Sequence, residues 1–106
     1  MRLTRILLAA SLGLALAGSA SAQSKTVRIE IKALTFPAET KAVVGDTIEW
    51  VNKDFVAHTA TGTRDEWRVV IEAGKSKTLV LKNAGTVSYY CEYHPEMTGR
   101  LIVAPN

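Results

Sequence analysis

Short stretches in which apolar and polar residues alternate run through most of this chain. Val27, Ile29 and Ile31 alternate with charged residues, which is the pattern of a strand with one buried face. No long stretch of residues 23–106 places its apolar residues at helical spacing. The sequence therefore predicts an all-β fold.

Turn sequences separate the predicted strands at regular intervals. Gly45-Asp46, Ala73-Gly74 and Asn83-Ala84-Gly85 are turn signals of this kind. Further strands are expected at residues 40–44, 47–52, 67–71, 77–82, 86–91 and 100–104. Seven or so short strands at this spacing favour an antiparallel β-sandwich or barrel. No linker, repeat or low-complexity segment interrupts residues 23–106, so we expect a single domain.

The first 22 residues are typical of an export signal. Two arginines precede an apolar run from Ile6 to Ala17, and small residues follow up to Ala22. This pattern indicates a secretory signal peptide, because the apolar run is too short to span a bilayer. We expect cleavage after Ala22, which would leave residues 23–106 in the periplasm with no stable membrane insertion.

The export signal accounts for much of the chain's positive charge. The full chain has 13 Lys and Arg against 10 Asp and Glu, a net charge of +3. Arg2 and Arg5 are lost with the signal, so the mature domain carries about +1. Such a nearly neutral domain is a poor candidate for binding nucleic acid.

Side chains that could bind a soft metal are few and lie in two places. After Met1 the chain has one cysteine, two histidines and one methionine. Two imidazoles, one thiolate and one thioether form the donor set expected of a mononuclear blue-copper centre. We therefore predict one Cu(I)/Cu(II) ion bound by His58, Cys91, His94 and Met97.

Each of these residues has a simpler interpretation when it is taken alone. A single exported cysteine can be half of an intermolecular disulfide, a reactive thiol or a buried apolar residue. His58 alone would be an ordinary histidine, and Met97 alone would be core filler. The spacing of Cys91, His94 and Met97 within seven residues favours a metal. Zinc is the rival ion, but a His₂Cys set with methionine suits copper better.

Two longer stretches resemble a known family. Gly45–Asn52 and Ala84–Met97, with His58 between them, are similar to the cupredoxins, the type 1 blue-copper proteins. The two residues between His94 and Met97 resemble the family members with a short ligand loop. The resemblance implies a Greek-key, cupredoxin-like β-sandwich of about seven to eight strands. It also implies one-electron transfer between protein partners, namely a dehydrogenase or a c-type cytochrome.

The resemblance also implies a role for each ligand. Both histidines would bind through imidazole nitrogen, Cys91 through its thiolate and Met97 as a weak axial ligand. Pro95 would stiffen the loop by fixing its φ angle, and Gly99 would permit a close turn into the last strand. His58 is expected from a neighbouring strand end across the sandwich.

Two positions depart from the family pattern. Relatives often have Asn or Ser after the first histidine, where this chain has Thr59. Glu92-Tyr93 stands between Cys91 and His94, where short-loop relatives have Thr-Pro. The first leaves open how the Cys91 region is braced. The second leaves the metal prediction intact, but it could change the loop's stiffness, the reduction potential and the partner surface.

Three functions could use such a site. A copper oxidase or reductase needs further histidine-rich centres, which two histidines cannot build, so we expect no enzymatic activity. The prediction is a small monomeric electron carrier. The alternative is a periplasmic protein that sequesters or delivers copper without redox cycling.

The expected electron exit is the exposed edge of the loop histidine. The resemblance implies that this edge belongs to His94, with Pro95 and Phe36 as its neighbours. Glu92 and Glu96 flank His94 and are either merely solvated or face a basic patch on a redox partner.

Overall fold

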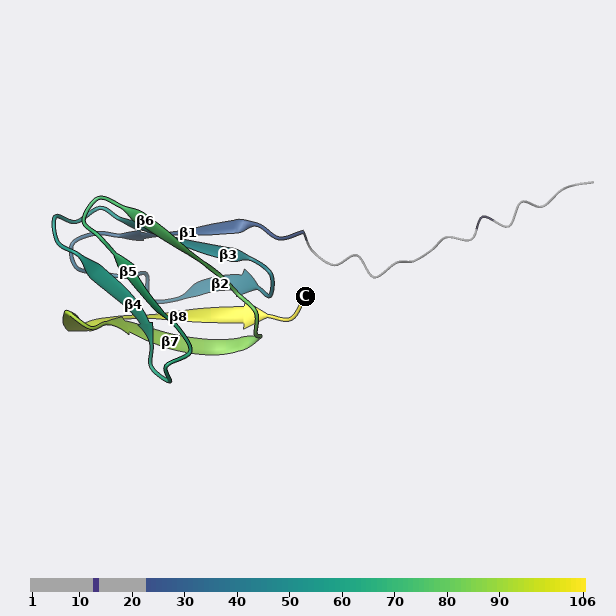
Figure 1. The fold of residues 1–106 in the computed structure, drawn as a ribbon. Helices are drawn as coiled ribbons and strands as arrows, with labels where there is room; N and C mark the ends of the chain where they lie inside the picture. The colour runs from purple at the N-terminus through teal and green to yellow at the C-terminus, as the bar shows by residue number, and fades with distance from the viewer. Residues whose placement is uncertain (1–12, 14–22) are drawn as a thin grey trace, which may run out of the picture.

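A computed structural model of the protein describes Gly13 and residues 23–106. Within these residues the chain is all-β and forms two facing sheets (Figure 1), which confirms the predicted fold class. The described part contains no helix long and apolar enough to cross a membrane. Apart from Gly13, the expected signal peptide at residues 1–22 lies outside the described residues and stays a prediction.

Eight strands make up the described fold, in line with the seven to eight expected. They are β1 (Thr26–Ile31), β2 (Thr40–Val43), β3 (Thr47–Asn52), β4 (His58–Gly62), β5 (Arg68–Ile71), β6 (Ser76–Val80), β7 (Gly85–Cys91) and β8 (His94–Ala104). One sheet has the order β1-β3-β6 and the other the order β2-β8-β7-β4-β5. Figure 1 shows the two sheets packed face to face.

Two of the six described strand pairs run parallel, so the expected antiparallel pairing holds for the other four. β1 pairs with β3 and β2 pairs with β8 in parallel, while β3–β6, β4–β5, β4–β7 and β7–β8 are antiparallel. Both parallel pairs join strands that are not consecutive in the chain. Alternation within a strand shows which face is buried but carries no information about the direction of a distant partner.

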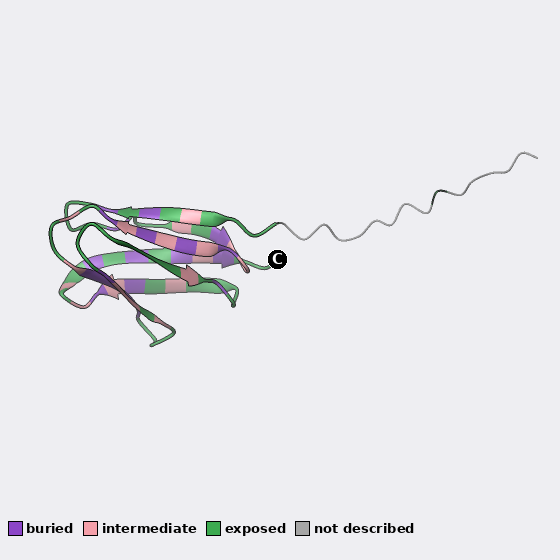
Figure 2. Cartoon of the chain, turned by 45° about the horizontal axis from the view of Figure 1, so that its top comes forward, coloured by how far each residue is buried: buried purple, intermediate pink, exposed green. Residues whose placement is uncertain are grey.

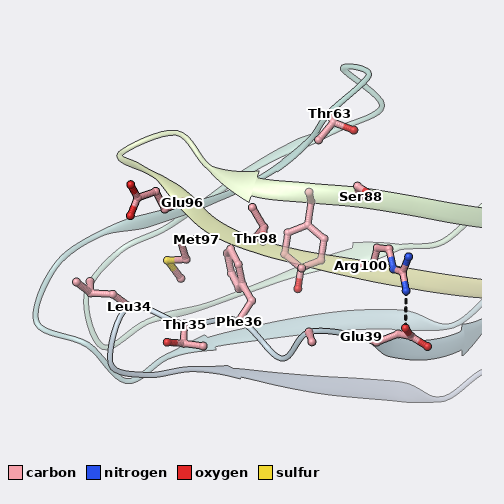
Figure 3. A pocket seen from close by; sticks show the side chains of 13 residues that line it. Leu34, Thr35, Phe36, Glu39, Thr63, Ser88, Glu96, Met97, Thr98 and Arg100 are labelled. Carbon is pink, nitrogen blue, oxygen red and sulfur yellow. Dashed lines mark hydrogen bonds and ion pairs between the residues drawn. The ribbon is translucent and has the colours of Figure 1, made fainter.

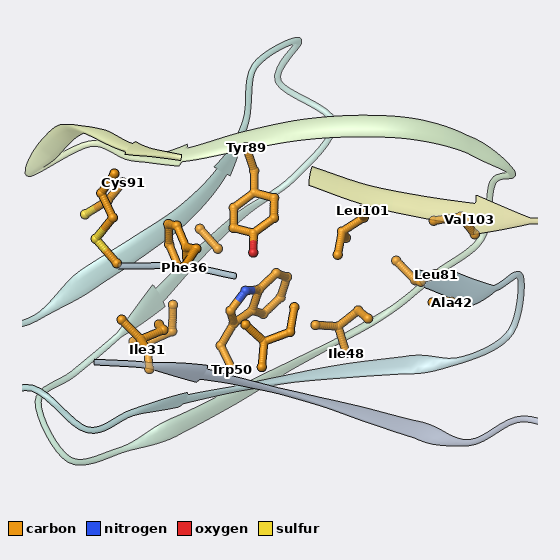
Figure 4. Close-up of a cluster of buried hydrophobic side chains, with 14 residues drawn as sticks. Ile31, Phe36, Ala42, Ile48, Trp50, Leu81, Tyr89, Cys91, Leu101 and Val103 are labelled. Carbon is orange, nitrogen blue, oxygen red and sulfur yellow. The ribbon is translucent and has the colours of Figure 1, made fainter. Parts of the chain in front are cut away.

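The buried faces of both sheets form one hydrophobic core. Figure 2 shows buried residues alternating with more exposed ones along several strands. At the centre lies an aromatic cluster, with Tyr89 between Phe36 and Trp50 at ring-centroid distances of 4.7 and 5.8 Å (Figure 4). Trp67 packs on Trp50 at 5.5 Å. Burial raises the pKa of Tyr89 to about 12, so this ring stays neutral at physiological pH.

Gly99 lies inside β8 and not at the turn that was expected there. It pairs with Tyr89 on β7, and a Cβ atom at Gly99 would lie 2.7 Å from Cζ and 2.8 Å from the hydroxyl oxygen of Tyr89. A glycine is therefore needed here because the tyrosine ring packs directly against the backbone of the neighbouring strand.

Gly99→Ala is expected to destabilise the metal-free domain by about 1–3 kcal/mol, because the buried ring of Tyr89 has little room to move away. Urea unfolding followed by circular dichroism measures this loss. In a Tyr89→Leu background the same substitution should cost clearly less. An equal cost in both backgrounds would show that the ring is not the obstacle.

Asp46, a residue that is only 2% exposed, anchors the turn between β2 and β3 through its carboxylate. Its Oδ1 accepts the N–H of Lys25 at 3.0 Å, and its Oδ2 accepts the N–H of Val43 at 2.9 Å. These bonds, with that from Lys25 the larger effect, lower the pKa of Asp46 below its ordinary value of 3.8.

Asp46→Asn should therefore lower stability in a pH-dependent way. A carboxyl whose folded pKa is depressed stabilises the fold above its unfolded pKa, and this contribution is lost as the pH falls through the folded pKa. The gap in melting temperature between wild type and variant should thus be largest near neutral pH and shrink below pH 3.8. Thermal unfolding of both metal-free proteins across this range tests the prediction, which a constant gap would contradict.

Candidate metal centre

His58 opens β4, a strand that the sequence did not predict. All five residues of β4 are buried, so they show no alternation from which a strand could be recognised. β4 lies next to β7 in the five-stranded sheet. His58 therefore approaches Cys91 from the adjacent strand of the same sheet, and not from across the sandwich as expected.

Cys91 and His94 flank a tight turn between two paired strands. β7 ends at Cys91, as predicted, Glu92 and Tyr93 form the turn, and β8 begins at His94. The last strand therefore starts earlier than the predicted Arg100. Cys91 pairs directly with His94, next to an irregularity in the ladder, so the turn places both side chains at one end of the sheet.

Three of the predicted ligands meet at this end of the sandwich. The Sγ atom of Cys91 lies 3.7 Å from Nδ1 of His58 and 3.6 Å from Nδ1 of His94. One donor atom of each residue falls within 4.8 Å of the other two. The two imidazole rings have centroids 5.2 Å apart.

These separations fit a single ion. Metal–sulfur bonds of about 2.3 Å and metal–nitrogen bonds of about 2.0 Å place two donors roughly 3.5–3.8 Å apart when they share one metal. The thiolate and imidazole donors belong to the His₂Cys set of type 1 copper. His58 and Cys91 are both fully buried, which keeps water away from these donors.

Met97, the fourth predicted ligand, lies on the inward face of β8. Its side chain is 5% exposed and points into the space between the sheets near Phe36 (Figure 3). It lines a surface cavity of about 520 Å³ together with His94 and Pro95. A buried thioether beside the loop histidine suits a weak axial ligand.

Thr59 fills the position at which relatives often have Asn or Ser. Its N–H donates to Sγ of Cys91 at 3.3 Å, and its hydroxyl accepts the N–H of Glu92 at 2.8 Å. Thr61 donates to the same hydroxyl at 3.0 Å. Thr59 thus ties the start of β4 to the Cys91 turn, although it differs from the residues usual in the family.

Sequence reasoning missed two polar residues that organise the approach to His58. Nδ2 of Asn52, which is 1% exposed, donates to the carbonyls of Val56 at 2.8 Å and Ile71 at 3.1 Å, and its Oδ1 accepts the N–H of Asp54 at 2.9 Å. Oδ2 of Asp54 lies 2.8 Å from Nε2 of His58. In the sequence, Lys53-Asp54 is typical of a turn, and that pattern does not indicate which residue the Asp54 side chain contacts.

Asp54 keeps its charge although it is largely buried. Desolvation opposes ionisation, but hydrogen bonds from the N–H of Leu34, from His58 and from the N–H of Ala33 outweigh it. The pKa of Asp54 is therefore lowered from its ordinary value of 3.8.

The surface around His94 differs from expectation at one residue. Phe36, expected beside the electron exit, is only 3% exposed and belongs to the core. Leu34 takes its place, since it is 49% exposed and lines the same cavity as His94 and Pro95.

The two acidic residues beside His94 have different surroundings. Glu92 accepts a hydrogen bond from Nε of Arg68 at 2.7 Å, so its charge is compensated within the chain. Glu96 is exposed and lines two cavities that Met97 also lines. Of the pair, only Glu96 has no ion pair within the described residues.

A second cavity, of about 660 Å³, extends from Met97 along β7 and β8 (Figure 3). At its far end Nη2 of Arg100 donates to Glu39 at 2.7 Å. This pair satisfies both charges, so the cavity offers no unpaired cation there.

Comparisons with known proteins point to one family. The cupredoxin-like domain family matches residues 4–103. Amicyanin from Paracoccus denitrificans is 30% identical over 71 residues, which are 61% of this chain and 54% of that protein. The chain thus spans about half the length of this curated relative.

Solved structures of amicyanin variants share the fold. A proline-to-alanine variant in its oxidised state is 26% identical, and a methionine-to-alanine variant in a Cu(I) form is 25% identical. Each alignment has a TM-score of 0.64 and covers 74% of this chain and 81% of the other. The family match spans nearly the whole sequence, and the chain belongs to the cupredoxin-like family.

Proposed function

We propose that this protein carries single electrons between redox partners as a type 1 blue-copper protein. The observation that carries the proposal is the meeting of two imidazoles and one thiol, which come from β4, β7 and β8. The Nδ1 atoms of His58 and His94 lie 3.7 and 3.6 Å from Sγ of Cys91. The proposed ligands are His58, Cys91, His94 and Met97.

The chain's own residues would keep this site rigid. Copper, when bound, supplies a one-electron couple between Cu(I) and Cu(II). The Thr59 N–H bond to Cys91 and the Thr59–Glu92 bond hold the thiol between two paired strands. Donors held in this way move little when the charge of the site changes, and a small rearrangement means a low barrier to electron transfer.

The proposed exit for the electron is the edge of His94. This ring is only partly buried, whereas His58 and Cys91 are fully buried. Leu34 and Pro95 beside it are exposed and apolar. They would let a partner approach and displace water from the contact.

Location and partners are part of the same proposal. We infer that residues 23–106 are the mature domain and work in the periplasm as a non-enzymatic monomer, with a dehydrogenase or c-type cytochrome as partner. The amicyanin relatives are known in oxidised and Cu(I) forms, which supports redox cycling here. The intact mass of the exported protein would test cleavage after Ala22.

Adding Cu(II) to the metal-free domain, with optical and electron paramagnetic resonance spectra, tests the function directly. We expect an intense visible band that disappears on reduction and returns on reoxidation without loss of metal. Absence of the band would overturn the proposal. Copper that binds but cannot be cycled, and passes to a competing chelator, would favour sequestration or delivery.

A further inference from the structure

We propose that Asp54 is a positioning residue that fixes the tautomer and orientation of His58, and that a left-handed turn at Ala33 and Leu34 holds Asp54 in place. The inference rests on the proposed copper site for its purpose. Its geometry, however, belongs to the protein alone and can be tested without metal.

Three donors converge on the Asp54 carboxylate. Oδ1 accepts the N–H of Ala33 at 2.7 Å, and Oδ2 accepts the N–H of Leu34 at 3.0 Å. Oδ2 also lies 2.8 Å from Nε2 of the fully buried His58. With only 14% of its side chain exposed, Asp54 meets these donors largely shielded from water.

This contact decides which ring nitrogen of His58 is available. Both oxygens of this carboxyl group already accept a backbone N–H, from Ala33 and from Leu34, so it acts as the acceptor and Nε2 of His58 carries the proton of the third contact. In the neutral ring Nδ1 then has a free lone pair, and this atom faces Sγ of Cys91 at 3.7 Å. A metal ligand needs that lone pair, and a carboxylate on the opposite nitrogen commonly secures it.

The turn that holds Asp54 has an uncommon backbone. Ala33 and Leu34 have φ angles of 51° and 55°, a region that residues with side chains rarely adopt twice in succession. Paired backbone hydrogen bonds between Lys32 and Thr35 close the turn. Successive N–H groups in such a turn form a concave site for an anion, and here that anion is the Asp54 carboxylate.

The same turn reaches the surface next to the proposed electron exit. Leu34 is 49% exposed and lines the cavity that also contains His94. Its N–H and the His58 ring bind the same carboxylate oxygen. Asp54 therefore joins the buried ligand to the exposed rim of the site.

Asp54→Asn tests the proposal, because an amide has one acceptor oxygen and cannot accept at both positions. The NH₂ group of the asparagine must replace either Oδ1, which accepts the N–H of Ala33, or Oδ2, which accepts from Leu34 and His58. At least one of these hydrogen bonds is then lost. We expect ¹⁵N spectra of the metal-free wild type at pH 8 to show His58 protonated on Nε2, and the variant to lose this single tautomer. Amide exchange at Ala33 and Leu34 should also accelerate.

Copper affinity gives a second readout, expected to fall by about 10–100-fold. Asp65→Asn is the matched control, since Asp65 is exposed, has a φ of 58° and belongs to the distant 62–65 turn. It should leave the His58 spectrum and copper affinity unchanged. Urea unfolding of both variants separates a local effect from a loss of fold.

The wild-type spectrum alone can overturn the inference, whatever the variant does, if His58 carries its proton on Nδ1. An unchanged tautomer and affinity in a folded Asp54→Asn protein would overturn it as well. If the wild type shows the expected tautomer but binds no copper, the proposed function fails while the positioning role stands.

Discussion

Cys91→Ser is expected to abolish the intense visible absorption of the Cu(II)-loaded protein completely. That band arises from charge transfer between a thiolate and Cu(II), and Cys91 is the sole cysteine of the chain. Serine is nearly isosteric, and its oxygen can still accept the N–H of Thr59, which now donates to sulfur at 3.3 Å. The fold should therefore survive while the colour is lost. A spectral titration with Cu(II), alongside far-UV circular dichroism, measures both.

Met97→Leu is the control for removing a sulfur atom from the same site. It keeps the thiol and both imidazoles and loses only the weak axial donor, so the band should persist with altered position and potential. A band of unchanged intensity in Cys91→Ser would refute the thiolate assignment. Loss of the band in Met97→Leu alone would show that the axial position has been misjudged.

The set of metal-binding side chains could be predicted because it follows from the chemistry of the residues and from how few of them can bind a soft metal. Few side chains in the sequence bind soft metals, and three of them lie within seven residues. The turn at Glu92 and Tyr93 needs no long-range information, since β7 and β8 are consecutive and antiparallel. The structure accordingly brings His58, Cys91 and His94 to within bonding range of one ion.

Features that depend on distant partners could not be predicted. β4 shows no alternation because all its residues are buried. Its two threonines can be buried because the hydroxyl of Thr59 accepts hydrogen bonds from the hydroxyl of Thr61 and from the N–H of Glu92. Gly99 looks like a turn residue until Tyr89 is seen against it. The bond between Asp54 and the Ala33–Leu34 turn joins residues about 20 positions apart, which no local pattern reveals.

Trp50→Ala is expected to have the largest effect on stability, a loss of about 3–5 kcal/mol from the metal-free domain. Trp50 is fully buried between Trp67 and Tyr89, and the cluster supports β7, which ends in Cys91. Domains of this kind have about 5–15 kcal/mol in total, so this loss is a large share of the whole stability. Urea unfolding monitored by circular dichroism provides the measurement.

Copper should restore much of what Trp50→Ala loses, because a ligand that binds only the folded state stabilises it, by about 4 kcal/mol at a thousandfold excess over Kd. Phe55→Ala is the matched control, since Phe55 is fully exposed and its loss should cost no more than about 0.5 kcal/mol. A Trp50→Ala loss as small as that of Phe55→Ala would show that the aromatic cluster does not hold the sheets together. Equal unfolding curves with and without copper would show that copper does not bind the folded domain in preference to the unfolded chain.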